Sequence, residues 1–191
     1  MREDIVQGAL DLLDETGDAQ AVTLRAVARR VGISAPSIYP HFRDPQAILL
    51  AVAQQAFGEL NAYLRAARDQ AGPDPVARLL AVCESYLAFA RARPSRYLVM
   101  FGGVWNAAQA VADAVVELDD VVALGRASLD DLAACLGECA AAGRSASTDP
   151  ATDATLLWAA LHGLAHQRVV TAAVPWSDED EARLISRLAY L

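Results

Sequence analysis

Apolar residues recur at helical intervals from the start of the chain. One face of a first helix, which Gly17 is expected to end, carries Ile5, Ala9, Leu12 and Leu13. A second, shorter helix repeats the i, i+3, i+4, i+7 pattern with Leu24, Val27, Ala28 and Val31. Thr23 is placed to cap the start of this second helix, and Gly32 is placed to end it.

The next segment contains two prolines and predicts a helix of about two turns. Ser34 is placed to cap it, and Pro36 falls in its first turn, where a missing N–H costs little. Pro40 lies deeper and leaves the carbonyl of Pro36 without its intrahelical donor, so the helix should be short. The side chains expected on it include Ile38, Tyr39 and Phe42.

Asp-Pro dipeptides mark the starts of three later helices, at residues 44–45, 74–75 and 149–150. Proline pushes the residue before it out of the α region and is itself preset for the first helical position, while the Asp carboxylate accepts a bond from an orphan N–H. An apolar piece covers residues 97–101, and residues 143–148 suggest a loop. The remaining helices are expected over 45–70, 75–93, 108–142 with Gly125 as a candidate break, 150–170, and a last stretch from about 178.

Alanine, the best helix former, makes up about a fifth of the chain, β-branched runs are scarce, and no segment is a convincing strand. The fold class expected is therefore all-α. Apolar residues are 54% of the chain, but charges interrupt every run short of the roughly 18 residues of a membrane span. Three cysteines are too few for a disulfide scaffold, and no apolar leader opens the sequence, so we expect a reduced, cytoplasmic protein without cofactor.

The charge is unevenly distributed. The formal net charge of -8 argues against a polyanionic partner, and residues 1–18 carry one Arg and six acids. Residues 19–43, in contrast, carry four Arg and no acid. This basic segment coincides with the second and third predicted helices, so any contact with nucleic acid should be made there.

Residues 23–43, TLRAVARRVGISAPSIYPHFR, read as a helix, a turn containing glycine, and a second short helix. This is the helix-turn-helix arrangement, which presents its second helix to the major groove. With the preceding helix, the segment resembles the N-terminal domain of the TetR family of bacterial transcriptional regulators over residues 3–50. The resemblance implies a DNA-binding domain at 1–48, a helical effector-binding and dimerisation domain at 49–191, and a homodimer on a double-stranded DNA operator.

The resemblance also implies which residues meet DNA. In it, Thr23 caps the second helix and meets a phosphate, Tyr39 and His41 touch phosphate and base, and Arg43 pairs with the backbone. The full set of implied DNA-binding residues is Thr23, Arg25, Ser34, Ala35, Pro36, Ser37, Tyr39, His41 and Arg43. Ala35 and Ser37 offer little hydrogen-bonding reach, so sequence discrimination should depend on methyl contacts, Arg25 and DNA shape.

The C-terminal part carries a Trp158-x-x-x-His162-Gly163 pattern that resembles one group of TetR effector domains. It implies a pocket for an unidentified, largely apolar small molecule. The candidate lining residues are aromatic or polarisable: Tyr86, Phe89, Tyr97, Met100, Phe101, Trp105, Trp158, His162 and His166. The alternative for these side chains is an ordinary core, with the histidines satisfied locally.

Metal sensing and catalysis have less support in the sequence. His162 and His166, like Cys135 and Cys139, are one helical turn apart and spaced to share a metal, but no third and fourth ligand is evident, so no metal site is expected. The sequence contains no nucleophile elbow, phosphate loop or carboxylate pair with a reaction to perform, so an enzyme is not expected. A metal-responsive regulator and a helical ligand-binding protein or enzyme without DNA affinity remain the alternatives to a ligand-responsive repressor.

Overall fold

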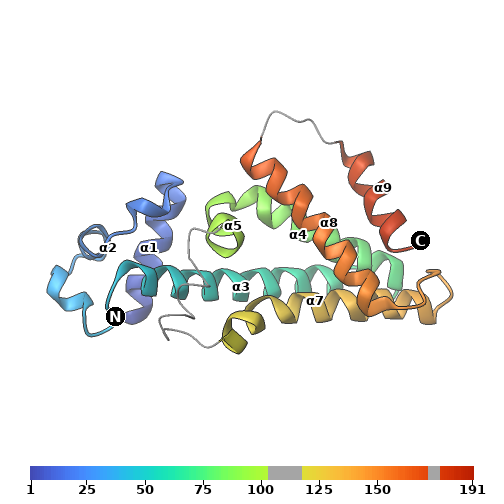
Figure 1. Cartoon of the computed structure of the whole chain (residues 1–191), viewed down its shortest axis with the longest axis horizontal. Coiled ribbons are helices and arrows are strands. Elements are labelled where there is room, and N and C mark those ends of the chain that lie inside the picture. The colour runs from blue at the N-terminus through green and yellow to red at the C-terminus, as the bar shows by residue number, and fades with distance from the viewer. Residues whose placement is uncertain (103–117, 172–176) are drawn as a thin grey trace. The chain divides into compact units, whose positions relative to one another are not determined.

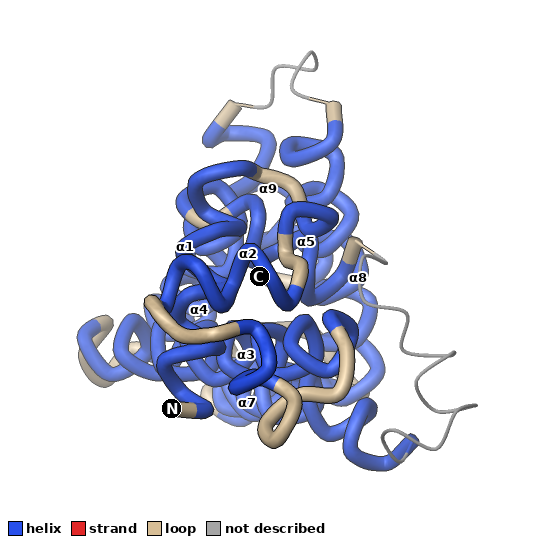
Figure 2. The backbone as a smooth tube through the Cα atoms, turned by 90° about the vertical axis from the view of Figure 1, so that its left-hand side faces the viewer, coloured by secondary structure: helices blue, strands red, loops and turns tan. Residues whose placement is uncertain are grey.

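The computed structural model describes residues 1–102, 118–171 and 177–191, and within these residues the chain is helical without a strand (Figure 2). The elements follow in the order α1 (Arg2–Thr16), η1 (Ala19–Ala21), α2 (Leu24–Val31), η2 (Ala35–Ile38), α3 (Pro45–Gln70), α4 (Pro75–Ala92), α5 (Pro94–Phe101), α7 (Leu118–Ala141), α8 (Pro150–Val170) and α9 (Asp178–Leu188) (Figure 1). The expected all-α class is confirmed.

Most helix boundaries lie where the caps predict them. Gly17 and Gly32 end α1 and α2 in the left-handed region, with φ of 66° and 75°. Each Asp of the three Asp-Pro dipeptides accepts a bond from a backbone N–H of the helix that follows. The distances are 2.8 Å from Asp44 to Ala47, 3.3 Å from Asp74 to Ala77 and 3.3 Å from Asp149 to Thr152.

Two expectations about helices were wrong. The third predicted helix is a single 3₁₀ turn, η2, and Ser34 makes no capping bond, because its Oγ lies 2.7 Å from Oγ of Ser37. Pro36 and Pro40 supply no N–H, so the segment cannot build a second α-turn of regular bonds. Gly125, in contrast, does not break its helix, since α7 is continuous from Leu118 to Ala141. Residues 108–117, also expected to be helical, lie outside the described residues.

The chain divides into two compact units. One consists of Met1–Gly58 with Arg93–Leu124, and the other of Glu59–Ala92 with Gly125–Leu191. The DNA-binding domain expected over residues 1–48 lies within the first unit, which also contains the following part of α3 up to Gly58 and all of α5. Val99 of α5 is buried in the N-terminal core, and Arg96 Nη2 lies 2.8 Å from Asp14 Oδ2 of α1.

In the N-terminal unit, α1, α2, η2 and the start of α3 enclose one apolar core, which includes Ile5, Leu10, Leu13, Val27, Ile38, Phe42 and Ile48. Helices α1 and α2 approach closely at Gly8, where an added Cβ would lie 2.6 Å from Val31 Cγ2. In the second unit, α4 packs against α8, and α8 against α9. None of the helices in the described parts of the chain is both long and apolar enough to cross a bilayer.

Candidate functional site

Local hydrogen bonds and buried side chains fix the helix-turn-helix, residues 23–43, on the core of the N-terminal unit. Thr23 Oγ1 accepts the Ala26 N–H at 3.2 Å, which fixes the start of α2. After α2, the Ile33 N–H reaches back to the Ala28 carbonyl at 3.0 Å and closes the turn. Ile38 and Phe42 are buried, and the amides of His41 and Phe42 both donate to the Ile38 carbonyl, at 2.8 and 2.9 Å. The recognition segment, residues 34–43, is therefore anchored at Ile38 and Phe42.

This anchoring turns the intervening side chains outward. Tyr39 is 61% exposed and His41 is also exposed, so neither belongs to the core. The other residues expected to meet DNA share this exposure, except Ala35, which is half-buried: Thr23, Arg25, Ser34, Pro36, Ser37 and Arg43 are all exposed. The predicted set thus lies between Thr23, which caps α2, and Arg43, just before α3, and all of its side chains except that of Ala35 are exposed.

The four arginines of the basic segment are not equivalent. Arg30 donates through both Nη atoms to the carboxylate of Glu15 on α1, and this bond lowers the pKa of Glu15. Arg43 Nε lies 3.2 Å from Oδ2 of Asp44. Arg25 and Arg29 are exposed and form no ion pair or hydrogen bond with any described residue. These two guanidiniums are therefore available to an anion without loss of an existing contact.

A further arginine lies beside the recognition segment and was missed in the sequence. Arg2 Cζ is 4.8 Å from the centre of the Phe42 ring, in the geometry of a cation–π contact. The contact joins the first turn of α1 to Phe42, one of the two buried anchors of the recognition segment. Sequence reasoning overlooked it because Arg2 lies among acidic residues and forty positions from its partner.

The predicted effector residues are divided between the two units. Tyr97, Met100 and Phe101 lie on α5 in the N-terminal unit, where the Phe101 ring lies 5.2 Å from Tyr97 and 5.3 Å from Phe57, between ring centres. Tyr86 and Phe89 lie on α4, and Trp158, His162 and His166 on α8, all in the second unit. Phe89 is a core residue, 1% exposed. Trp105 lies outside the described residues.

A small cavity in the second unit brings two of these residues together. Tyr86 and Trp158 line it with Leu64, Val82, Cys83, Ser128, Leu132 and Leu161. Its volume is about 10 Å³, which is room for about one water molecule. Its polar side chains are already satisfied in part, because Ser128 donates to Asn61 and the Tyr86 hydroxyl lies 3.2 Å from His162 Nδ1.

His162 is the centre of a stack along α8. Its ring lies 5.2 Å from that of Trp158 and 6.3 Å from that of His166, both nearly parallel to it. Burial lowers the pKa of His162, and the neighbouring His166 lowers it further. At neutral pH the His162 imidazole is therefore neutral and can share one proton with the Tyr86 hydroxyl.

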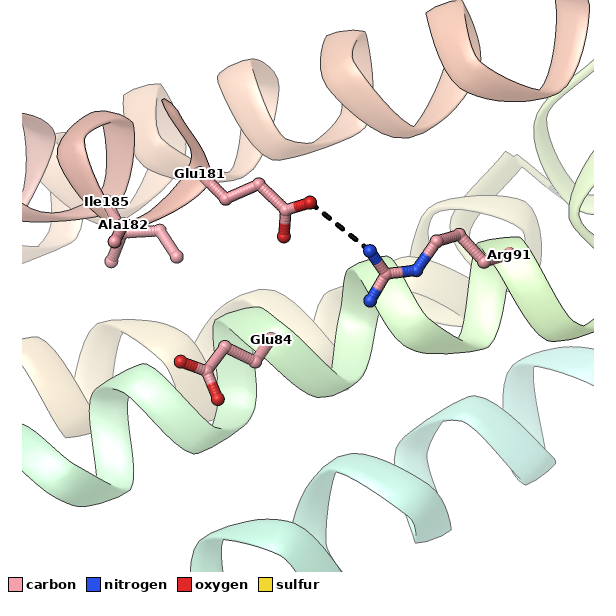
Figure 3. Close-up of a pocket in the computed structure, with 5 residues that line it drawn as sticks. All are labelled: Glu84, Arg91, Glu181, Ala182 and Ile185. Carbon is pink, nitrogen blue, oxygen red and sulfur yellow. Dashed lines mark hydrogen bonds and ion pairs between the residues drawn. The ribbon is translucent and has the colours of Figure 1, made fainter. Parts of the chain in front are cut away.

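A larger cavity lies between α4 and α9. It has a volume of about 320 Å³ and is lined by Glu84 and Arg91 of α4 and by Glu181, Ala182 and Ile185 of α9 (Figure 3). Arg91 Nη1 lies 3.2 Å from Oε1 of Glu181, which Arg168 of α8 also contacts. We call it the α4/α9 cavity. Nothing in the sequence pattern suggested it.

The cysteines are buried. Burial raises the pKa of Cys135 to about 11 and raises those of Cys83 and Cys139, so all three are thiols at neutral pH. Among the residues that the structure describes, no three His, Cys, Asp or Glu side chains gather as metal ligands would. The described part of the chain thus offers no support for a metal-responsive site.

Comparison with known proteins gives the family. Residues 5–52 match the family model of bacterial regulatory proteins of the tetR family, and residues 79–189, more than half of the chain, match that of the tetracyclin repressor-like C-terminal domain. The tetracycline repressor protein class A from transposon 1721 of Escherichia coli is 40% identical over 59 residues, 31% of this chain and 27% of that protein. The HTH-type transcriptional regulator BetI of Stenotrophomonas maltophilia is 30% identical over 83 residues, 44% of this chain and 42% of that protein.

The chain thus aligns with only about a quarter to two fifths of the length of these curated relatives. Solved structures, in contrast, match over nearly the whole of this chain. A protein with unknown function from Rhodococcus sp. RHA1 has 28% identity and a TM-score of 0.79, covering 98% of this chain and 93% of that one. The TetR family transcriptional regulator PfmR from Thermus thermophilus shares the fold, with a TM-score of 0.68, 20% identity and coverage of 97% and 96%. Because both parts of the sequence match models of one family, the chain belongs to the TetR family of bacterial transcriptional regulators.

Proposed function

We propose that this protein is a ligand-responsive repressor that binds a double-stranded DNA operator through residues 23–43. The observation that carries the proposal is the outward position of Tyr39 and His41 between the buried anchors Ile38 and Phe42. An exposed aromatic ring and imidazole on a turn fixed by the core are placed for a surface contact and contribute little to packing. Because bacterial DNA lies in the cytoplasm, we propose that the protein acts there.

The residues expected to meet DNA each have a proposed role. Thr23 and Arg43 contact phosphates, while Arg25, Tyr39 and His41 reach bases and the adjacent backbone. Ser34, Ala35, Pro36 and Ser37 form the leading edge of the recognition segment, where their small side chains contact base edges and methyl groups. Arg2 adds a cation next to Phe42. Affinity depends on these local charges, because the chain as a whole carries a net charge of -8.

The protein acts as a homodimer in this proposal, and the exposed face of α8 supplies the interface. Leu156 is 53% exposed, and Ala159 and Gly163, at the following positions of the same helix face, are exposed as well. Small residues around one large apolar side chain allow a second helix to approach closely. Two recognition segments must then enter major grooves about 34 Å apart, so the operator should be close to a palindrome.

The effector is a small, largely apolar molecule that enters beside Tyr86, Trp158 and His162. Because the cavity there has room for about one water, the effector must displace side chains, and the ligand-free protein is the closed state. The Tyr86–His162 pair offers one polar anchor within apolar walls. A coupling of about 1–3 kcal/mol between effector and operator would weaken DNA binding about 5- to 150-fold.

The first experiment is a gel shift with the DNA upstream of the protein's own gene, at two salt concentrations. We expect a retarded complex whose affinity falls steeply as salt rises, because phosphate contacts release counterions. A scrambled fragment of equal length is the control. A protein that retards neither fragment at low salt, or both equally, contradicts the proposed operator binding.

A further inference from the structure

The α4/α9 cavity has the volume of a small-molecule site and a mainly charged lining. Its volume of about 320 Å³ lies at the lower end of the range typical of ligand pockets, about 300–1,000 Å³. One wall is α4, with Glu84 and Arg91, and the other is α9, with Ala182 and Ile185 (Figure 3). The cavity lies within the second unit and does not involve the DNA-binding surface.

One of the three charged lining residues is already fully engaged. The Glu181 side chain is 8% exposed, and its carboxylate is shared by Arg91 of α4 and Arg168 of α8. Two guanidiniums on one carboxylate satisfy its charge and fix its position in the lining of the cavity. A ligand gains little by competing for it.

Arg91 keeps donors for a ligand. Its side chain is 49% exposed, and the bond to Glu181 uses Nη1. Within the described residues, its Nε and Nη2 make no hydrogen bond. The Arg91 end of the cavity therefore offers the guanidinium donors Nε and Nη2 and suits an anion such as a carboxylate.

Glu84 has the opposite preference. It is exposed and makes no hydrogen bond or ion pair with any residue that the structure describes. Figure 3 shows its carboxylate pointing away from Arg91, beneath Ala182. Glu84 and Arg91 are seven residues apart on α4, which is about 10.5 Å along the helix axis. The two charges therefore do not satisfy each other across the cavity.

We propose that the α4/α9 cavity binds a small zwitterion whose ammonium group meets Glu84 and whose carboxylate meets Arg91. A short aliphatic chain between the two charges would lie along Ala182 and Ile185. A ligand with a single charge meets an unfavourable end of the cavity, whereas a zwitterion with separated charges complements both ends. This binding does not depend on operator recognition, so it is measured on the full chain without DNA.

The probe is 6-aminohexanoate, titrated by isothermal calorimetry at neutral pH and low salt. We expect a dissociation constant of about 1 mM or tighter, in keeping with a small ligand held at both ends. Hexanoate and hexylamine carry one charge each on the same chain and should bind at least about tenfold more weakly, because each loses one charge-assisted contact. Absence of binding by 6-aminohexanoate at about 10 mM, or equal binding of hexanoate or hexylamine, overturns the proposal.

The variant Glu84→Gln removes the charge that should hold the ammonium and keeps the shape of the side chain. We expect 6-aminohexanoate to bind it at least about tenfold more weakly. Glu179→Gln is the matched control, because Glu179 lies on α9 with a side chain 79% exposed and does not line the cavity. Unchanged binding by Glu84→Gln, or an equal loss in Glu179→Gln, contradicts the assigned role of Glu84.

Discussion

Gly8 of α1 lies against Val31 of α2 so closely that a Cβ on Gly8 would stand 2.6 Å from Val31 Cγ2. Real Cβ atoms do not approach other atoms to this distance, and valine cannot easily turn its branched side chain away. The glycine therefore sets the separation of the two helices that support the recognition segment.

We expect Gly8→Ala to lower the free energy of unfolding by about 1–2 kcal/mol. The clash costs about 1–3 kcal/mol and outweighs the gain of up to about 1 kcal/mol that alanine brings to a helix interior. Denaturant unfolding followed by circular dichroism measures the change. Gly58→Ala in α3 is the control, because a Cβ there meets nothing within 4 Å, and it should be stabilising.

The double variant Gly8→Ala/Val31→Ala separates the clash from other effects. Removing the Val31 methyl groups makes room for the new Cβ, so the two changes should be less than additive. Strict additivity would contradict the assignment of the cost to this contact.

A substitution at an exposed position of the recognition segment should weaken DNA binding without lowering the stability of the fold. Tyr39→Ala should weaken operator binding at least about tenfold, because it removes a direct contact, and should leave the melting temperature nearly unchanged, because the side chain is 61% exposed. Fluorescence anisotropy with a labelled operator and thermal unfolding test the two halves. Tyr190→Ala removes another exposed tyrosine, far along the chain, and should leave DNA binding intact.

Two arginines of the basic segment should differ in their effect on salt dependence. Arg25 is unpaired within the described residues, whereas Arg30 is held by Glu15. Each loses one positive charge on substitution by Gln. We expect Arg25→Gln to reduce the slope of log affinity against log salt by about one per subunit, and Arg30→Gln to change it little. Equal slopes in the two variants would contradict the assigned contacts.

His162 predicts how stability depends on pH. Its pKa in the folded state is lowered from the ordinary value of 6.5 by burial and by His166, so folding favours the neutral imidazole. The stability that it contributes is fully present above about pH 6.5 and is lost as the pH falls through the lowered folded-state pKa. His162→Gln should remove this part of the acid sensitivity, measured as the difference in unfolding free energy between about pH 7.5 and about pH 5.

The stacking of His162 on His166 also predicts a change in the pKa of His162 that can be measured directly. Since the positive charge of His166 opposes protonation of His162, His166→Gln should raise the pKa of His162 towards 6.5. Titration of the imidazole C–H resonances by NMR reports it. A pKa of His162 that stays unchanged in the variant would assign the whole effect to burial.

The face of α8 predicts the oligomeric state. Leu156→Arg places a charge in the proposed interface and should convert the dimer to a monomer, as measured by light scattering after size exclusion. Ala127→Arg introduces the same group at an exposed position of α7 and should leave the dimer intact. A wild-type protein that is monomeric at all concentrations tested would remove the interface and the palindromic operator together.

Local chemistry made much of the fold predictable from the sequence. The caps at Thr23, Asp44, Asp74 and Asp149 and the glycine ends at Gly17 and Gly32 depend on residues close in sequence. What failed depends on distant partners or on competing local bonds. The Ser34 hydroxyl was expected to cap a helix and instead meets that of Ser37.

The site shows the same division. The exposure of the set proposed to contact DNA follows from the helix-turn-helix pattern, because the pattern itself fixes which side chains are buried. The pocket residues were chosen by aromatic type, and type does not say which residues share a cavity. Glu181 lies near the start of the last helix expected from the sequence, yet its side chain is buried between Arg91 and Arg168, 90 and 13 residues earlier in the chain. Periodicity within one helix contains no information on such partners.

If operator binding is as proposed, the two prolines of the recognition segment restrict how its sequence specificity changes. Pro36 and Pro40 are exposed and hold their own φ near about −65°, so this stretch of backbone is already restricted before it meets a groove. The backbone of this segment then loses little conformational entropy when it binds DNA. A rigid backbone also leaves adaptation to the side chains alone, which favours stepwise changes at positions 35, 37 and 39 over any rearrangement of the loop.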